Sequence, residues 1–408
     1  MNPVTAPLAP AADGALSYLK VLDLSRVLAG PWASQMLADM GAEVIKIEHP
    51  ERGDDTRSWG PPYLKDPQGH DVESAYFLCT NRNKKSVALD MATSEGQRQI
   101  RELALQSDVL IENFKVGGLA RYGLDCASLS ALNPRLIYCS ITGFGQTGPY
   151  AQRPGYDFMV QGMGGLMSLT GVPDGEDGAG PMKVGVALTD VLTGLHAVAG
   201  ILAAVAWRER SGLGQHIDLS LLDVQVSCLA NQALSHLVTG ESPQRLGNAH
   251  PSIVPYQSFP TADGEMILAV GNDSQFASLC RVAGHSGWAA DPRFATNAAR
   301  VTHRGELVPL LRQVTVQRTT AQWIGALETA NVPCGPINTL EQVFADPHVQ
   351  ARGLRVDLPH PLAGTAPAVA SPLRFSRTPV QYRWAAPALG AHTEPVLARL
   401  RKGPVPDA

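Results

Sequence analysis

Short apolar runs and amphipathic segments alternate along the first part of the chain. The β-branched apolar runs are typical of strands and cover residues 20–24, 43–47, 108–112 and 136–140. Helical patterns lie between them, over 31–40 and 94–106. The first of these helices opens with proline and the second with serine, followed by Glu95. This alternation predicts an α/β fold with a Rossmann-like, doubly wound parallel sheet.

The longest apolar stretch runs from Leu195 to Trp207 and is followed at once by three charged residues. It is shorter than the roughly 20 residues that a membrane-spanning helix needs, so it predicts a buried helix. This helix should begin near Thr189 and Asp190, and Asp190 is a candidate for its cap. It should end at Gly212, because glycine can adopt the left-handed conformation that closes a helix.

The pattern changes between residue 211 and about residue 300. Residues 247–260 form an irregular polar and aromatic segment, and Glu265 begins a strand-like run that ends at Val270. This change indicates a second, smaller domain. The proline-rich tail from Pro359 onward predicts extended rather than helical structure.

Composition and charge limit the classes of partner. The 408 residues are 44% hydrophobic and 17% charged, which is typical of a soluble chain with room for two domains. Lys and Arg number 33 against 37 Asp and Glu, and the longest basic cluster is the pair Lys84 and Lys85. We therefore expect neither a nucleic-acid partner nor a membrane surface, and we expect a cytoplasmic protein.

Several common cofactor motifs are missing from the sequence. The six cysteines form no C-x-x-C pair and have no histidine at metal-ligand spacing, so we expect reduced cysteines and no metal site. The turn between the first strand and the first helix holds one glycine, which excludes the dinucleotide fingerprint, and no phosphate-binding G-x-x-x-x-G-K-[ST] loop occurs. A permanently bound nucleotide cofactor is not expected.

The segment from Arg153 to Met159 carries the most informative candidate for chemistry. It sets Asp157 directly after a Pro-Gly turn and before a glycine-rich apolar stretch. A carboxylate there is a candidate nucleophile, because attack on an acyl group gives a mixed anhydride that divides one hard transfer into two easier steps. The alternative is that Asp157 is an Asx-type turn residue or a helix cap.

These residues carry a resemblance to a known family. The chain resembles the class III CoA-transferases, which include formyl-CoA transferase, from Val21 to about His392. The most specific matching segments are 26–31, 41–48, 53–57, 81–86, 112–114, 140–149, 154–157, 247–251 and 389–393. Further segments, 252–257 and 335–338, are similar to the branch that moves CoA from succinyl-CoA to glutarate.

The resemblance implies a mechanism. Asp157 would attack the donor thioester, the CoA thiolate would leave and return to form an aspartyl-CoA thioester, and the acceptor carboxylate would open it through a second anhydride. Backbone N–H groups around Gly162 to Gly165 would hold the oxyanion; close helix packing is the alternative reason for these glycines. The substrates would be an acyl-CoA, expected to be succinyl-CoA, and a small acid such as glutarate, itaconate, citramalate or a sulfinate analogue.

Family likeness also implies the binding residues. The expected CoA contacts are Val27, Leu28, Ala29, His49, Arg57, Leu89, Asn113, Phe114, Arg121 and Tyr122. Of these, Arg57 and Arg121 are the cations expected at the phosphates, unless they are solvated surface arginines. The expected acyl and acceptor pocket contains Arg82, Gln146, Tyr156, Gly164, Gly165, His250 and Tyr256. Arg82 is the leading candidate for the far carboxylate of a dicarboxylate, and a structural ion pair is its alternative role.

The resemblance further implies an interlocked homodimer, in which each chain passes through a ring formed by the other. Residues 18–210 and 326–408 would build the large Rossmann-like CoA-binding domain and 225–325 a small α+β domain. Residues 211–224 would link them, and 1–17 would be a disordered lead-in.

An α-methylacyl-CoA racemase is the main alternative, because that family shares the fold and much of the sequence framework. Racemases carry a histidine base where this chain has Tyr156, opposite an aspartate whose counterpart is Asp190. Tyrosine, with a pKa of about 10, is a poor base at neutral pH, so the sequence favours the transferase. A non-catalytic acyl-CoA-binding module is less favoured still, since keeping Asp157 in a dry pocket would cost stability without a use.

Overall fold

The computed structural model describes residues 14–401 and divides the chain into two compact units. The large unit contains residues up to 166, residues 183–240 and residues from 350 onward; the small unit contains residues 167–182 and 241–349. The expected lead-in over residues 1–17 lies outside the described residues as far as residue 13. Leu16 is buried in the core of the large unit.

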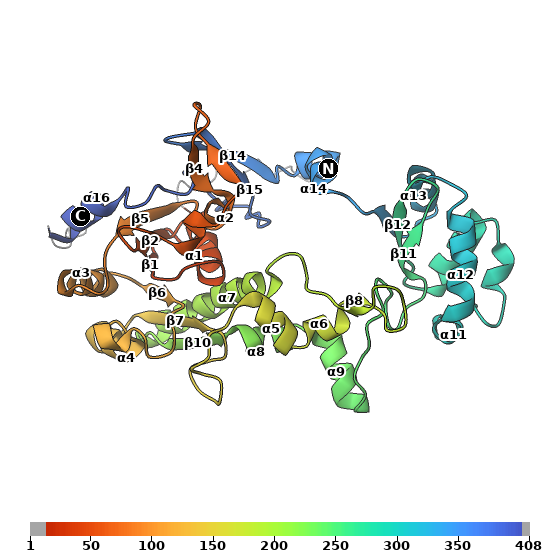
Figure 1. Ribbon diagram of the computed structural model, residues 1–408, viewed down its shortest axis with the longest axis horizontal. Coiled ribbons are helices and arrows are strands. Elements are labelled where there is room, and N and C mark those ends of the chain that lie inside the picture. Colours follow the sequence, from red (N-terminus) through yellow and green to blue (C-terminus); the bar gives the residue numbers. More distant parts are fainter. Residues whose placement is uncertain (1–13, 402–408) are drawn as a thin grey trace, which may run out of the picture. The chain divides into compact units, whose positions relative to one another are not determined.

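A six-stranded sheet forms the centre of the large unit (Figure 1). Every neighbouring pair of its strands is parallel, which confirms the predicted parallel α/β sheet. In spatial order the strands are β10 (His216–Ser220), β7 (Ile137–Thr142), β6 (Val109–Glu112), β1 (Lys20–Asp23), β2 (Glu43–Glu48) and β5 (Lys84–Ala88).

Helices cover both faces of this sheet because its strands present apolar side chains in both directions. Val21 and Val109 pack with α1 (Ala29–Asp39) and α7 (Leu188–Ser211) in one core. Leu22 and Leu110, one residue further along the same strands, pack with α3 (Ser94–Leu105), α4 (Cys126–Leu132) and α16 (Thr393–Arg401) in another. This is the doubly wound arrangement that the sequence predicts.

Helix α7 is longer than the apolar stretch that predicted it. It has 24 residues, and an 18-residue window within it has a mean hydropathy of 1.7, so by length and composition alone it could cross a membrane. Its inward side, including Ala197 and Ile201, is buried against the sheet, which is typical of a core helix. The helix ends at Gly212, whose φ of 77° is the predicted left-handed cap.

Two expectations about the later part of the chain are wrong. The predicted linker 211–224 contains strand β10 and the start of α8 (Leu221–Ser227), because residues 216–220 pair with β7. The tail contains the hairpin of β14 (Arg355–His360) and β15 (Gly364–Val369) and no helix as far as residue 392, as predicted, but it ends in α16, whose Val396 is buried against the sheet.

The remaining elements of the large unit are short. They are η1 (Asp55–Ser58), β3 (Tyr63–Lys65), β4 (Asp71–Ser74), α2 (Ala75–Leu78), η2 (Ala120–Tyr122), α5 (Asp157–Met163) and α9 (Ala230–Thr239). Two further helices, α6 (Leu166–Leu169) and α15 (Pro347–Ala351), lie where the chain passes between the units.

The small unit has its own core around a three-stranded antiparallel sheet with the order β11 (Tyr256–Pro260), β12 (Glu265–Ala269), β13 (Cys334–Pro336). Its helices and short strands are β8 (Gly171–Val172), β9 (Gly180–Pro181), α10 (Asp273–Val282), η3 (Ser286–Ala289), α11 (Asn297–Thr302), α12 (Arg304–Thr315), α13 (Thr320–Thr329) and α14 (Leu340–Ala345). The main part of the unit, 241–349, begins and ends later than the small domain 225–325 that the sequence analysis expected, and the unit also contains residues 167–182.

Candidate active site

A cavity of about 260 Å³ lies where three parallel strands of the large unit end. Its walls come from the turn after β1, the loop after β6, the loop after β7 and the segment that leads into α5. Asp190 from the first turn of α7 also lines it. Ligands of open α/β sheets bind outside the carboxyl ends of the strands, so this cavity is a candidate active site.

A wider pocket of about 710 Å³ shares part of the wall of this cavity. The two have Arg26, Phe114, Lys115 and Val116 in common. A long ligand such as CoA could therefore occupy both, with its reacting end in the smaller cavity.

The structure brings together most of the residues expected to contact CoA. Val27, Leu28, Ala29, Asn113 and Phe114 line the smaller cavity. His49, Leu89, Phe114, Arg121 and Tyr122 line the wider pocket.

Arg57 is the exception among these residues, because it lines neither space. It is buried, its Nε and Nη2 donate to the Glu48 carboxylate at 2.8 Å, and it also pairs with Glu73. Two carboxylates thus offset its charge. Arg52, which the sequence analysis missed, lines the wider pocket together with Arg121. It belongs to the same loop as Arg57, and the sequence carries no signal that distinguishes the two.

Asp157 lies at the start of α5 but caps a different helix. Its Oδ1 accepts the backbone N–H of Thr189 at 2.8 Å and that of Asp190 at 3.4 Å. Its Oδ2 accepts Nε2–H of Gln161 at 2.7 Å. The carboxylate thus satisfies free N–H groups at the start of α7, as a capping residue does, and Asp157 is not among the residues that line the cavity.

Asp190 occupies the position in the cavity that the sequence analysis expected of Asp157. It is partly buried, and none of residues 14–401 donates a hydrogen bond to its carboxylate. Burial and then the nearby charge of Asp157 raise its pKa to about 7. Asp190 does not cap α7, because the helix begins two residues earlier, at Leu188, and Asp190 instead lines the cavity. Of the two carboxylates, Asp190 is thus the one that lines the cavity, and the catalytic role expected of Asp157 stays a prediction.

Arg82 makes a buried ion pair, which was the alternative role considered for it. Its Nη2 lies 2.6 Å from Oδ2 of Asp39, and its Nε donates to Oδ1 of Asp39 at 2.9 Å. Its Nη1 donates to the carbonyl of Val369 at 2.9 Å. Arg82 lines neither the smaller cavity nor the wider pocket, so a role in binding the acceptor stays a prediction that these contacts do not favour.

The other expected acceptor residues are dispersed. Tyr156 lines the cavity and is 66% exposed. The backbone N–H of Gln146 bonds the carboxylate of Asp218. Gly164 packs closely, since a Cβ there would lie 2.5 Å from the side chain of Gln225; this is the packing role considered for these glycines.

His250 and Tyr256 belong to the small unit. The two rings contact each other at a centroid distance of 5.3 Å, and the backbone N–H of His250 donates to the carbonyl of Tyr256 at 2.9 Å. They form one local cluster within that unit.

Comparisons with known proteins identify the family. The family model described as CoA-transferase family III matches residues 16–393. A succinate–glutarate CoA-transferase of Agrobacterium fabrum is 54% identical over 94% of this chain and 95% of its own length. The human succinyl-CoA:glutarate CoA-transferase is 41% identical over 94% of this chain and 85% of its own.

Comparison with solved structures gives matches that cover nearly the whole chain. A CAIB/BAIF family protein from Brucella suis superposes with a TM-score of 0.85 at 49% identity, covering 95% of this chain and all of that one. Rv3272 from Mycobacterium tuberculosis superposes with a TM-score of 0.81 at 30% identity, over 95% of this chain and all of that one. This chain belongs to CoA-transferase family III.

Proposed function

We propose that this CoA-transferase moves CoA from succinyl-CoA to a short dicarboxylate-like acid, and that the Asp190 carboxylate carries the transfer. One observation supports the assignment above others: Asp190 is a carboxylate without a hydrogen-bond donor among the described residues, in the wall of the cavity at the strand ends. Relatives named for succinyl-CoA with glutarate, D-citramalate or mesaconate support the donor and the class of acceptor.

The proposed reaction conserves the thioester energy at each step. An Asp190 oxygen attacks the thioester carbonyl carbon and the C–S bond breaks, which releases CoA as thiolate and leaves a mixed anhydride of Asp190 and succinate. The thiolate then attacks the aspartyl carbonyl, releasing succinate and leaving an aspartyl-CoA thioester. The acceptor carboxylate displaces CoA from this thioester, and the thiolate attacks the acceptor side of the second anhydride. Acceptor-CoA leaves and the Asp190 carboxylate is restored.

Asp157 has a supporting role in this proposal. It binds the backbone N–H groups of Thr189 and Asp190, so it fixes the turn of α7 that carries the nucleophile. Its charge also contributes to the raised pKa of Asp190. A partly protonated carboxylate reacts only after losing its proton, so the transfer rate should rise with pH.

The acceptor's far carboxylate needs a cation, and the cavity wall offers three. Arg26, Lys115 and Arg153 line it, whereas Arg82 does not. Arg26 already faces Asp55 at 2.8 Å. Lys115 and Arg153 are therefore the stronger candidates for binding a dicarboxylate.

The experiment is a transfer assay with succinyl-CoA and a panel of acids: glutarate, itaconate, citramalate and a sulfinate analogue. New acyl-CoA and released succinate are quantified by mass spectrometry for the wild type and for Asp190→Asn. Equal formation of both products with at least one acid, abolished in the variant, is expected. Incorporation of solvent deuterium into an α-methylacyl-CoA without any transfer would support the racemase instead, which the names of the relatives do not favour.

The assembly proposed for this enzyme is the interlocked homodimer that its family resemblance implies. Such a dimer cannot dissociate without unfolding. We expect a dimer mass that does not change on dilution to nanomolar protein, and a reversible monomer would contradict the proposal. We also propose that the enzyme acts in the cytoplasm without a permanently bound cofactor.

A further inference from the structure

The turn between β1 and α1 holds a residue in an unfavourable conformation. Val27 has a φ of 72°, in the left-handed region that β-branched residues rarely adopt. A conformation of this kind is energetically unfavourable and persists only where the surroundings impose it. Val27 lines the candidate active-site cavity together with Leu28 and Ala29, so the unfavourable backbone lies at the site itself.

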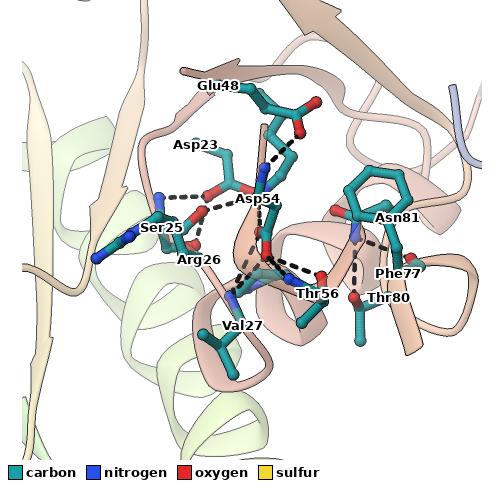
Figure 2. A network of polar contacts seen from close by, with 12 residues as sticks. Asp23, Ser25, Arg26, Val27, Glu48, Asp54, Thr56, Phe77, Thr80 and Asn81 are labelled. Atoms are coloured by element: carbon teal, nitrogen blue, oxygen red, sulfur yellow. Dashed lines mark hydrogen bonds and ion pairs between the residues drawn. The ribbon is translucent and has the colours of Figure 1, made fainter. Parts of the chain in front are cut away.

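Asp54 is the group that imposes this conformation on Val27. The backbone N–H of Val27 lies 3.3 Å from both carboxylate oxygens of Asp54 (Figure 2). Oδ1 of Asp54 also accepts the backbone N–H of Thr56 at 3.0 Å and its hydroxyl at 2.8 Å. The backbone N–H of Asp54 donates to Oε2 of Glu48 at 3.0 Å, and this bond fixes the backbone that carries the Asp54 carboxylate.

A second side chain fixes the preceding residue of the turn. Oδ1 of Asn113 accepts the backbone N–H of Arg26 at 2.9 Å, and its Nδ2 donates to the Arg26 carbonyl at 2.7 Å. With Arg26 fixed on one side by Asn113, the hydrogen bonds to Asp54 decide which way the peptide before Val27 points.

Lys46 keeps the Asp54 carboxylate charged although it is buried. Its Nζ lies 2.8 Å from Oδ2 of Asp54, and the two side chains are 1% and 0% exposed. Burial by itself would raise the pKa of Asp54, but Lys46 and the hydrogen bonds from Thr56 lower it to about 2. Lys46 also donates to the carbonyl of Ser25 at 2.8 Å, in the same turn.

We propose that Asp54 is a positioning residue for CoA transfer, whose buried carboxylate holds Val27 in the left-handed conformation that shapes the cavity beside Asp190. This inference rests on the proposed function, since it names the group that shapes the thioester-binding turn. A network that only stabilises the sheet would not need to hold a strained valine in the wall of the cavity.

The test compares Asp54→Asn with Asp108→Asn, a control at a second ion pair, whose arginine is buried and whose aspartate side chain is 27% exposed. Oδ1 of Asp108 bonds Nη1 of Arg208 at 2.8 Å, at the other end of the parallel strands and away from both pockets. Both variants should lose thermal stability. Only Asp54→Asn should lose kcat, by ~10- to 100-fold, and weaken CoA binding in calorimetry.

A rescue experiment separates positioning from folding. Glycine adopts a positive φ without strain, so Val27→Gly combined with Asp54→Asn should recover most of the lost kcat, whereas Val27→Ala combined with Asp54→Asn should not. Equal activity in the two double variants would overturn the inference, and so would an Asp54→Asn variant that matches Asp108→Asn. A wild-type enzyme with no transferase activity but normal CoA binding would instead overturn the proposed function.

Discussion

Replacing Asp190 by asparagine should stabilise the protein, and the gain should depend on pH. The pKa of Asp190 is raised to about 7 in the folded state, above the ordinary value of 3.8. Between these values the folded protein keeps a proton that the unfolded chain has lost, so this group makes stability fall as pH rises. Above pH 7 the loss of stability caused by the charged Asp190 carboxylate is complete, and an uncharged asparagine removes this loss.

The size of this effect follows from the pKa. A rise of about three units corresponds to about 4 kcal/mol at about 1.4 kcal/mol per unit. The side chain is only partly buried, and solvent screening lowers the figure to about 1–2 kcal/mol. For a chain of 408 residues, whose unfolding entropy is about 0.9 kcal/mol/K, that is a gain in Tm of about 1–2 °C at pH 8, falling to zero near pH 4.

Thermal unfolding measured in steps from pH 5 to pH 8.5 checks this prediction. Asp157→Asn is the control, because it removes a carboxylate that caps α7 and should lower the free energy of unfolding by ~1 kcal/mol. The reasoning would be refuted if the Asp190→Asn variant had a lower Tm than the wild type at pH 8, or if its Tm differed from that of the wild type by the same amount at every pH.

Three further predictions follow from the same contacts. The kcat/KM of the wild type for succinyl-CoA should rise with pH through about 7, as Asp190 of the free enzyme loses its proton; a flat pH profile of kcat/KM would contradict a carboxylate nucleophile with this pKa. Arg82→Lys should lower Tm, because the bidentate pair with Asp39 is lost, and should leave KM for the acceptor unchanged; a rise of ten-fold or more would restore Arg82 as an acceptor ligand. Gly143→Ala should lower kcat more than ~10-fold, since its Cβ would lie 2.6 Å from Cα of Gly155 and displace the loop before α5; unchanged kinetics would show that this close approach is not needed.

The parallel sheet could be predicted because local pattern determines it. Strands buried on both faces read as continuous apolar runs, and the residues that follow them in sequence gather at one edge of the sheet. For this reason Val27 and Asn113 could be expected at one ligand site from their positions after β1 and β6, together with the family resemblance.

The choice between two aspartates could not be predicted in this way. Asp157 and Asp190 are 33 residues apart, and which of them is free depends on how α5 meets the start of α7. The same holds for Arg82, whose partner Asp39 lies 43 residues earlier. Helix α16 was missed because only its packing against the sheet, through Val396, favours a helix after a proline-rich tail.

The site of covalent attachment tests the central claim most directly. The wild type is incubated with succinyl-CoA without an acceptor, trapped with hydroxylamine and digested, and the peptides are analysed by mass spectrometry. We expect an aspartyl hydroxamate on the peptide with Asp190, present in Asp157→Asn and absent in Asp190→Asn. A hydroxamate on the peptide with Asp157, retained in Asp190→Asn, would contradict the account and return the nucleophile to Asp157.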